Sequence, residues 1–215
     1  MTGALRRRTG DPVVLADGEG WVAEARLISI AKGRVEAEIV SVHREPVPES
    51  GGVTVALAVV SGRQMDWAVQ KTVEVGVRRF VPIVTERTQF RQGDAGARID
   101  HWRRVSMQAL KQCRRPWAMT IGDVVPLSEF VDIESKAGGG VVADREGFRI
   151  GEFPEHIRST LVVGPEGGFT AEESRLFDRH NWPRVRLGPH VLRAETAAVV
   201  GAAMLVARCE TVEDS

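Results

Sequence analysis

The chain has few cysteines, no long apolar run and no excess of charge of either sign. Its two cysteines, Cys113 and Cys209, stand far apart without a CxxC pair or histidine-rich surroundings. This argues against a disulfide framework and a zinc site, and it fits a reducing compartment. Because no run of about 18 apolar residues occurs, a membrane-spanning helix is not expected. We therefore expect a soluble, cytoplasmic protein without a membrane partner.

The lack of net charge limits the kinds of partner. Lysine and arginine number 29, as do aspartate and glutamate, so the formal net charge is zero. The field of the whole molecule then neither attracts nor repels polyanions, and any RNA binding must come from local basic patches. Apolar residues make up 43% of the 215 positions and charged residues 27%, a balance typical of a packed globular protein.

The pattern along the chain changes near residue 50. Residues 11–42 read as short alternating strands separated by turns, which predicts a small β module over residues 1–48. A linker-like stretch, PVPESGG, follows. From residue 53 to 215, apolar strands alternate with helical patterns, which predicts an α/β domain with a mostly parallel sheet. Its strands are expected at 53–60, 79–84, 141–144, 161–164 and 185–188.

Helical spacing is clearest in four places. One helix is expected to carry Met65, Val69 and Val73 on its buried face, and a second runs over about 101–115 until Pro116 closes it. Thr170 and Glu173 form a T-x-x-E pattern that predicts a capping box at the start of a helix. The stretch 194–208 is apolar almost all round, so this last helix should be deeply buried.

Two strand ends carry glycine-rich segments. LVVGPEGGFTAEE (161–173) is a buried strand, a glycine loop and a capped helix, whereas LGPHVLRAETAAV (187–199) is a strand end followed by the last helix. Glycines let a ligand approach bare backbone, and ligands of α/β sheets bind at the carboxyl ends of strands. If the two ends lie side by side, they form a pocket suited to a purine edge and an amino-acid moiety. A phosphate loop is disfavoured because no Lys-Ser/Thr follows. The alternative is that the glycines form only a tight turn and bind no ligand.

These two segments, in this order and spacing, resemble those of the SPOUT methyltransferases, and within that class the ribosomal RNA small subunit methyltransferase E family. LRRRTGD with the β module is similar to the PUA-like N-terminal domain of that family. MDWAVQKTVEVGV followed by FVPIVTERTQ is similar to its first catalytic-domain helix and strand. The chain begins where the family already has a preceding strand region, so the PUA-like β-barrel module is expected to be shortened.

The resemblance implies an α/β SPOUT-type parallel sheet with a C-terminal trefoil knot, a homodimer and S-adenosyl-L-methionine (SAM) as cofactor. It also implies methylation of N3 of one uridine in 16S rRNA of the small ribosomal subunit. Carried over by motif, Arg193 and Glu195 would face the target base. The cofactor site would be lined by Val163, Gly164, Glu166, Gly167, Leu187, Gly188 and Leu192.

The chemistry of uracil assigns roles to some of these residues. Methylating N3 requires removal of its proton, and the resulting anion spreads onto O2 and O4, so Arg193 is assigned to stabilise it. The base is left open between Glu195, Glu166 and a water. No metal is required, because the leaving group is already a positively charged sulfonium. A structural ion pair or helix-end charge remains the alternative for Arg193 and Glu195.

A local basic stripe is the expected RNA contact. Along the predicted 101–115 helix, Arg104, Lys111 and Arg115 recur at helical spacing, with Arg114 beside them, and contacts of this kind position RNA through its phosphates. Arg6 and Arg7 form a second candidate patch. For the stripe on the predicted helix, the competing interpretation is a solvent-exposed helix face that binds no RNA.

Two further functions stay open at this level. The chain can be another SPOUT RNA methyltransferase, acting on a tRNA base or a ribose hydroxyl. It can also be a non-catalytic RNA-binding or ribosome-assembly protein. The retained glycines Gly164, Gly167 and Gly188 argue against the second, because a site without a cofactor needs no bare-backbone turns.

Overall fold

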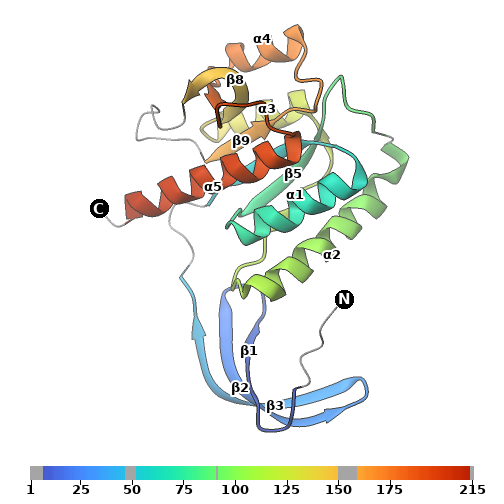
Figure 1. Cartoon of the computed structure of the whole chain (residues 1–215), viewed down its shortest axis with the longest axis vertical. Helices are drawn as coiled ribbons and strands as arrows, with labels where there is room; N and C mark the ends of the chain where they lie inside the picture. The colour runs from blue at the N-terminus through green and yellow to red at the C-terminus, as the bar shows by residue number, and fades with distance from the viewer. Residues whose placement is uncertain (1–6, 47–51, 91, 150–158, 214–215) are drawn as a thin grey trace. The chain divides into compact units, whose positions relative to one another are not determined.

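The computed structural model of the chain describes residues 7–46, 52–90, 92–149 and 159–213. The chain divides into two compact units. One contains the residues up to Val47 together with Arg114–Ala118, and the other contains Pro48–Cys113 and Met119–Ser215. Figure 1 labels helices and some of the strands of both units.

The smaller unit contains a three-stranded antiparallel sheet in the order β1-β2-β3. The strands expected from the alternating pattern are present, with the two long ones joined by the Lys32-Gly33 turn. Within the described residues β1 and β3 are free edges, and Ala25 and Leu27 are the buried apolar residues of this sheet. The sheet is therefore open in the described part of the unit. The strands are β1 Pro12–Ala16, β2 Trp21–Ala31 and β3 Arg34–Arg44.

A segment from much later in the chain completes the smaller unit. A Cβ built on Gly20, whose φ is +94°, would lie 2.7 Å from Cε2 of Trp117, so only glycine lets the indole pack this closely. The indole Nε1 of Trp117 also donates to the carbonyl of Pro46 at 3.1 Å. Sequence analysis did not anticipate that residues 114–118 belong to this unit.

The larger unit is built on a seven-stranded sheet whose strand pairs are all parallel, in the order β10-β8-β9-β4-β5-β6, with β7 also beside β5. The predicted α/β class with a parallel sheet is confirmed. The strands are β4 Thr54–Ala58, β5 Arg79–Val84, β6 Thr120–Ile121, β7 Val125–Pro126, β8 Val141–Arg149, β9 Thr160–Val163 and β10 Arg184–Arg186.

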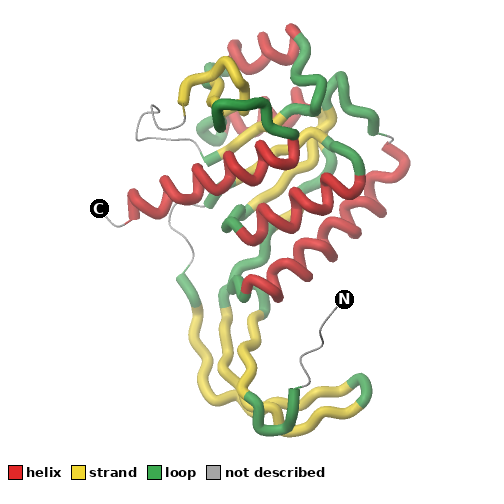
Figure 2. The backbone as a smooth tube through the Cα atoms, viewed as in Figure 1, coloured by secondary structure: helices red, strands yellow, loops and turns green. Residues whose placement is uncertain are grey.

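Helices cover the sheet of the larger unit (Figures 1 and 2). α1 packs against α2 and α5, and α5 also packs on β4 and β9, while α3 packs against α4 and β5. Within the described residues no helix is both long and apolar enough to cross a membrane. The helices are α1 Gly62–Glu74, the 3₁₀ turn η1 Gln92–Asp94, α2 Ala95–Cys113, α3 Leu127–Lys136, α4 Ala171–Arg179 and α5 Ala194–Glu213.

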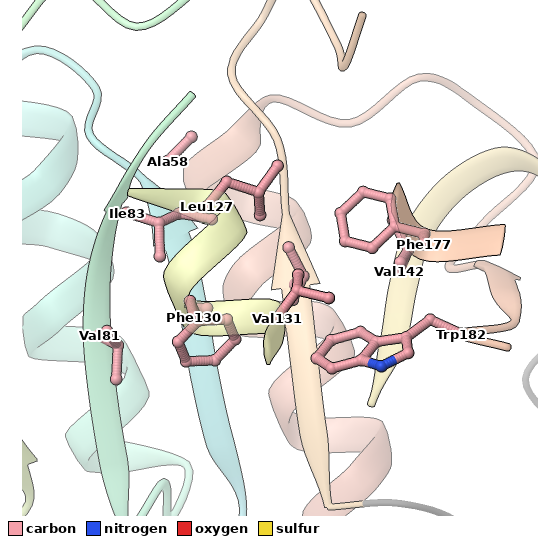
Figure 3. Packing of buried hydrophobic residues seen from close by; sticks show 11 residues of the cluster. Ala58, Val81, Ile83, Leu127, Phe130, Val131, Val142, Phe177 and Trp182 are labelled. Atoms are coloured by element: carbon pink, nitrogen blue, oxygen red, sulfur yellow. The ribbon is translucent and has the colours of Figure 1, made fainter. Parts of the chain in front are cut away.

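Strand β4 is buried on both faces, as its continuous apolar sequence predicts. Ala56 and Ala58 belong to a cluster with Phe130 of α3 and Phe177 of α4. Figure 3 shows this cluster from close by, with Trp182 beside Phe130. The two rings meet edge to face at 6.4 Å between centroids, a favoured aromatic geometry.

The last helix fits closely against the sheet. A Cβ on Gly201 of α5 would lie 2.5 Å from Cδ2 of Leu161 in β9, so the helix approaches the strand more closely than an alanine would permit. Ala198, Ala202 and Leu205 are buried on the same helix. The predicted burial of this helix is confirmed, and the helix continues to Glu213.

Helix α2 begins earlier and ends earlier than expected. It starts at Ala95 and stops at Cys113, with Trp102 and Leu110 buried. Arg114 adopts a left-handed conformation with φ +59°, and the next residue precedes a proline, which disfavours helical backbone. The expected helix over 101–115 was therefore wrong at its end, and Arg114 and Arg115 are not part of it.

Gly147 allows β10 to pair with β8. A Cβ on Gly147 would stand 2.5 Å from both the carbonyl oxygen of Arg184 and the amide nitrogen of Val185. We expect Gly147→Ala to lower the free energy of unfolding by about 1–3 kcal/mol, because backbone must move to relieve the overlap. The control is Gly96→Ala in α2, where a Cβ meets nothing within 4 Å. Chemical denaturation measures both, and equal stabilities would contradict the prediction.

Candidate functional site

A cavity of about 590 Å³ opens at the carboxyl ends of β9 and β10, beside residues 142–146 of β8. This position is the usual one for ligands of open α/β sheets, and the volume lies within the range of small-molecule sites. Three segments form its wall: residues 142–146 of β8, the glycine loop 163–169 after β9, and residues 184–192 from β10 to the start of α5.

The glycine loop has a defined turn at its centre. Gly168 has φ +68°, and its amide donates to the carbonyl of Pro165 at 2.8 Å. The helix that follows is held by the predicted capping box, which is confirmed: the Glu173 amide donates to Thr170 Oγ1, and the Thr170 amide donates to Glu173 Oε2. The left-handed backbone of this loop thus occurs at Gly168.

All the residues carried over as cofactor-binding lie on the wall of this one cavity. The structure brings together two segments that are about twenty residues apart in the chain. A Cβ on Gly188 would meet no protein atom within 4 Å, so the backbone there is open to a ligand. The seven residues are Val163, Gly164, Glu166, Gly167, Leu187, Gly188 and Leu192.

Contrary to expectation, the two strands that end in the glycine segments, β9 and β10, are not neighbours in the sheet. Strand β8 separates β9 from β10 in the sheet, so Asp144 and Glu146 of β8 enter the cavity wall between them. Sequence reasoning missed these residues and Arg184. An acidic residue directly after a short buried apolar run, as in VVAD, was the available signal for Asp144.

One arginine of the cavity wall, Arg184, is held by acidic neighbours. Arg184 Nη1 donates to Asp178 Oδ1 at 2.6 Å, and its Nε lies 3.7 Å from Asp144 Oδ2. The hydrogen bond with Asp178 raises the pKa of Arg184, and the same bond lowers the pKa of Asp178. Arg184 thus stays charged with a fixed orientation at the edge of the cavity.

The two residues expected to face the target base have different surroundings. Arg193 is exposed and lines neither this cavity nor the one beside it. Glu195 is only 8% exposed, and its Oε2 is buried with no partner among the described residues. Its Oε1 accepts from Gln64 Nε2 at 3.4 Å, and the same amide nitrogen donates to Glu166 Oε1 at 3.3 Å. Sequence reasoning missed Gln64, for which helical periodicity gave no signal.

The residues expected to contact RNA are divided between the two units. Arg104 and Lys111 are exposed on α2, and Arg104 Nε donates to the Asp100 carbonyl of its own helix. Arg114 and Arg115 belong to the smaller unit, so the predicted single stripe is not formed by one helix. Arg7 is exposed in the smaller unit, whereas Arg6 lies outside the described residues.

A family model for the RNA methyltransferase domain matches residues 48–206, which include both glycine segments. The ribosomal RNA small subunit methyltransferase E of Aquifex aeolicus (strain VF5) is 31% identical over 191 residues, covering 86% of this chain and 80% of the relative. The chain belongs to the ribosomal RNA small subunit methyltransferase E family.

Solved structures agree with this membership. A methyltransferase from Legionella pneumophila, in complex with the bound cofactor SAM, has a TM-score of 0.84 and 29% identity, covering 94% of this chain and 85% of that one. The methyltransferase E of Neisseria gonorrhoeae, bound to S-adenosyl methionine, has a TM-score of 0.82 and 28% identity, with 93% and 84% covered. Like its family, this chain is an RNA methyltransferase.

Within the residues that the structure describes, no three histidine, cysteine or acidic side chains are grouped to hold a metal ion. Of the acidic side chains on the cavity wall, Asp144 lies near Arg184, and Glu166 accepts from Gln64.

The Asp178–Arg184 pair predicts a pH-dependent contribution to stability. Because the pKa of Asp178 is lowered in the folded protein, its carboxylate stabilises the fold above its unfolded-state pKa. That contribution is lost as the pH falls through the lowered folded value. We expect Asp178→Asn to melt below the wild type near neutral pH and the difference to vanish in acid. Thermal unfolding across the pH range tests this, with exposed Asp123→Asn as control, and a pH-independent difference would contradict it.

Proposed function

We propose that this chain methylates N3 of one uridine in 16S rRNA of the small ribosomal subunit, with SAM as the methyl donor. The observation that carries the proposal is the cavity of about 590 Å³ whose wall contains both glycine segments. The family gives the reaction class, and the similar proteins from Legionella pneumophila and Neisseria gonorrhoeae hold SAM. A cytoplasmic location follows from ribosomal RNA as substrate.

The residues of the cavity fit this cofactor. Val163, Leu187 and Leu192 supply apolar surface for a purine, while open backbone at Gly188 permits close approach. Asp144 adds a carboxylate suited to ribose hydroxyls or an ammonium group. When bound, SAM supplies a methyl group on a positively charged sulfonium.

The chain itself must handle the proton of uracil N3. Glu195 lines neither cavity wall, but among the described residues its buried Oε2 has no donor, so it can accept a hydrogen bond there. Glu166 is exposed at the cavity wall and shares the Gln64 amide with Glu195. The base is therefore one of these two carboxylates or a water held by them.

Arg193 is proposed to stabilise the uracil anion in the active site of a partner copy. It is exposed and lines neither described cavity of its own chain, as expected for a side chain that serves a second protomer. The proposed assembly is thus a homodimer. RNA phosphates are then held by Arg104 and Lys111 of α2, with Arg7, Arg114 and Arg115 as contacts from the smaller unit.

The proposal extends to topology and domains. After β9 the chain runs outward to β10, beyond β8, and then returns as α5 to pack on β9 and β4. This return path is compatible with a C-terminal trefoil knot in a SPOUT domain over 53–215. The open sheet of the smaller unit is proposed to be part of a PUA-like module over 1–48.

The proposal is tested first with the wild-type protein. Calorimetric titration with SAM should show binding, and mass spectrometry of small-subunit RNA after incubation with both should show a new methyl group on uridine N3. Binding with methylation at another position would favour a different RNA target. Absence of binding would favour a non-catalytic RNA-binding protein.

Gly188→Val tests the location of the cofactor. The new side chain meets no protein atom at its Cβ and would instead occupy the cavity, so SAM affinity should fall at least about tenfold without loss of the fold. The matched control is Gly96→Val, which is equally unobstructed and lies outside the cavity wall. Equal SAM affinities in calorimetry would place the cofactor elsewhere.

Arg193→Ala separates catalysis from cofactor binding. We expect turnover to fall by about 10²–10³, the usual effect of losing one donor to a developing anion, while SAM affinity stays unchanged. Arg193→Lys should restore part of the rate because it keeps the charge. Unchanged turnover of the alanine variant would remove this residue from the mechanism.

A further inference from the structure

A second cavity of about 440 Å³ adjoins the first. It lies at the carboxyl ends of β4 and β5. Its wall comprises residues 59–62, Gln64, residues 87–89, Arg98 and the stretch 165–167. Residues 165–167 also line the first cavity. Methyl transfer requires the acceptor to contact the donor, so an acceptor site must adjoin the cofactor site. The second cavity meets this requirement.

One side of the second cavity is cationic. Arg98 of α2 is half-buried, and its guanidinium carbon lies 5.3 Å from the ring centroid of Phe90. Among the described residues no carboxylate forms an ion pair with Arg98. Arg87 is nearby and donates to the carbonyl of Gly167. A guanidinium that rests on an aromatic ring without an anionic partner is suited to bind a phosphate.

The other side of the second cavity presents the carboxylate of Glu166 as a hydrogen-bond acceptor, whereas Glu195 lies outside the wall. Gln64 donates to Glu166 at 3.3 Å and to Glu195 at 3.4 Å, and both contacts are long, so one amide is shared by two carboxylates. Ser61 Oγ donates to Gln64 Oε1, which fixes the orientation of the amide. Carboxylates repel a phosphate but accept from N–H groups. A ligand with an anion at one end and an N–H donor at the other matches both sides.

We propose that the second cavity receives the target nucleotide, with its phosphate on Arg98 and its base edge toward Gln64 and Glu166. A uridine monophosphate unit has this polarity, since its phosphate is anionic and its N3 carries a proton. This inference rests on the proposed function, because it takes the first cavity as the SAM site. It adds Arg98 as a phosphate ligand and Gln64 as a positioning residue for the two carboxylates.

The phosphate end is tested with Arg98→Gln. Binding of the variant to small ribosomal subunits, measured over a range of salt concentrations, should be about tenfold weaker than that of the wild type. The slope of log affinity against log salt should fall by about 0.7–0.9, the value for one phosphate contact. SAM affinity in calorimetry should not change. Arg98→Lys keeps the charge and should retain the slope.

The matched control is Arg175→Gln, which removes an exposed arginine of α4 outside both cavity walls. If Arg98→Gln and Arg175→Gln have the same affinity and slope, the proposal is wrong. Loss of SAM binding in Arg98→Gln would also overturn it, because the residue would then act on the cofactor site. A further outcome is that the wild type binds subunits with a salt slope that depends on Arg98 and yet transfers no methyl group. That result would contradict the proposed methylation but support the role of Arg98 in RNA binding.

The base end is tested with Gln64→Met, which keeps the length of the side chain but removes its donors. The single-turnover rate of methyl transfer at saturating subunits should fall about tenfold or more, while the salt slope and SAM affinity stay at wild-type values. Gln108→Met, at an exposed position of α2, is the control. An unchanged rate in Gln64→Met would remove this residue from the site.

Discussion

The constraint on which the larger unit depends is the burial of a parallel sheet. In a parallel sheet of this kind, helices occupy the faces, so ligands reach the chain at the strand ends. In β4 the stretch from Val55 to Ala58 is fully buried, and both cavities open at carboxyl ends of neighbouring strands. Strand β9 is central to this arrangement, because the loop that follows it borders the cavity on each side. Residues 165–167 therefore belong to the walls of both cavities.

Polar side chains hold the connections at this edge of the sheet in place. Glu173 accepts from the Glu86 amide through Oε1 and from the Thr170 amide through Oε2, both at 2.8 Å, so one carboxylate connects the residues after β5 to the start of α4. Gln64 makes the corresponding connection between α1 and the glycine loop. Charge-assisted bonds of this kind are stronger than neutral ones. They position the loops that border the two cavities.

Local patterns in the sequence predicted most helices and strands of the larger unit. The continuous apolar run of β4, the RFVPIV strand and the Thr170–Glu173 capping box occur where expected, because each is specified by neighbouring residues. Predictions failed where a distant contact decides the outcome. Arg114 leaves the helix in a left-handed conformation, and the residues after it join the smaller unit. Strand β8 lies between the two glycine-containing strands, because strand order depends on crossovers that periodicity does not record.

The amino-acid sequence by itself determined the α/β class, the two glycine segments and the family to which the chain belongs, since these follow from the order and spacing of neighbouring residues. Tertiary structure alone decided that Asp144 and Arg184 stand in the wall of the first cavity and that Arg193 lies outside it. It also placed Gln64 between Glu166 and Glu195, residues 102 and 131 positions away in the chain. Such contacts arise from the packing of helices on a sheet, and no local pattern encodes them.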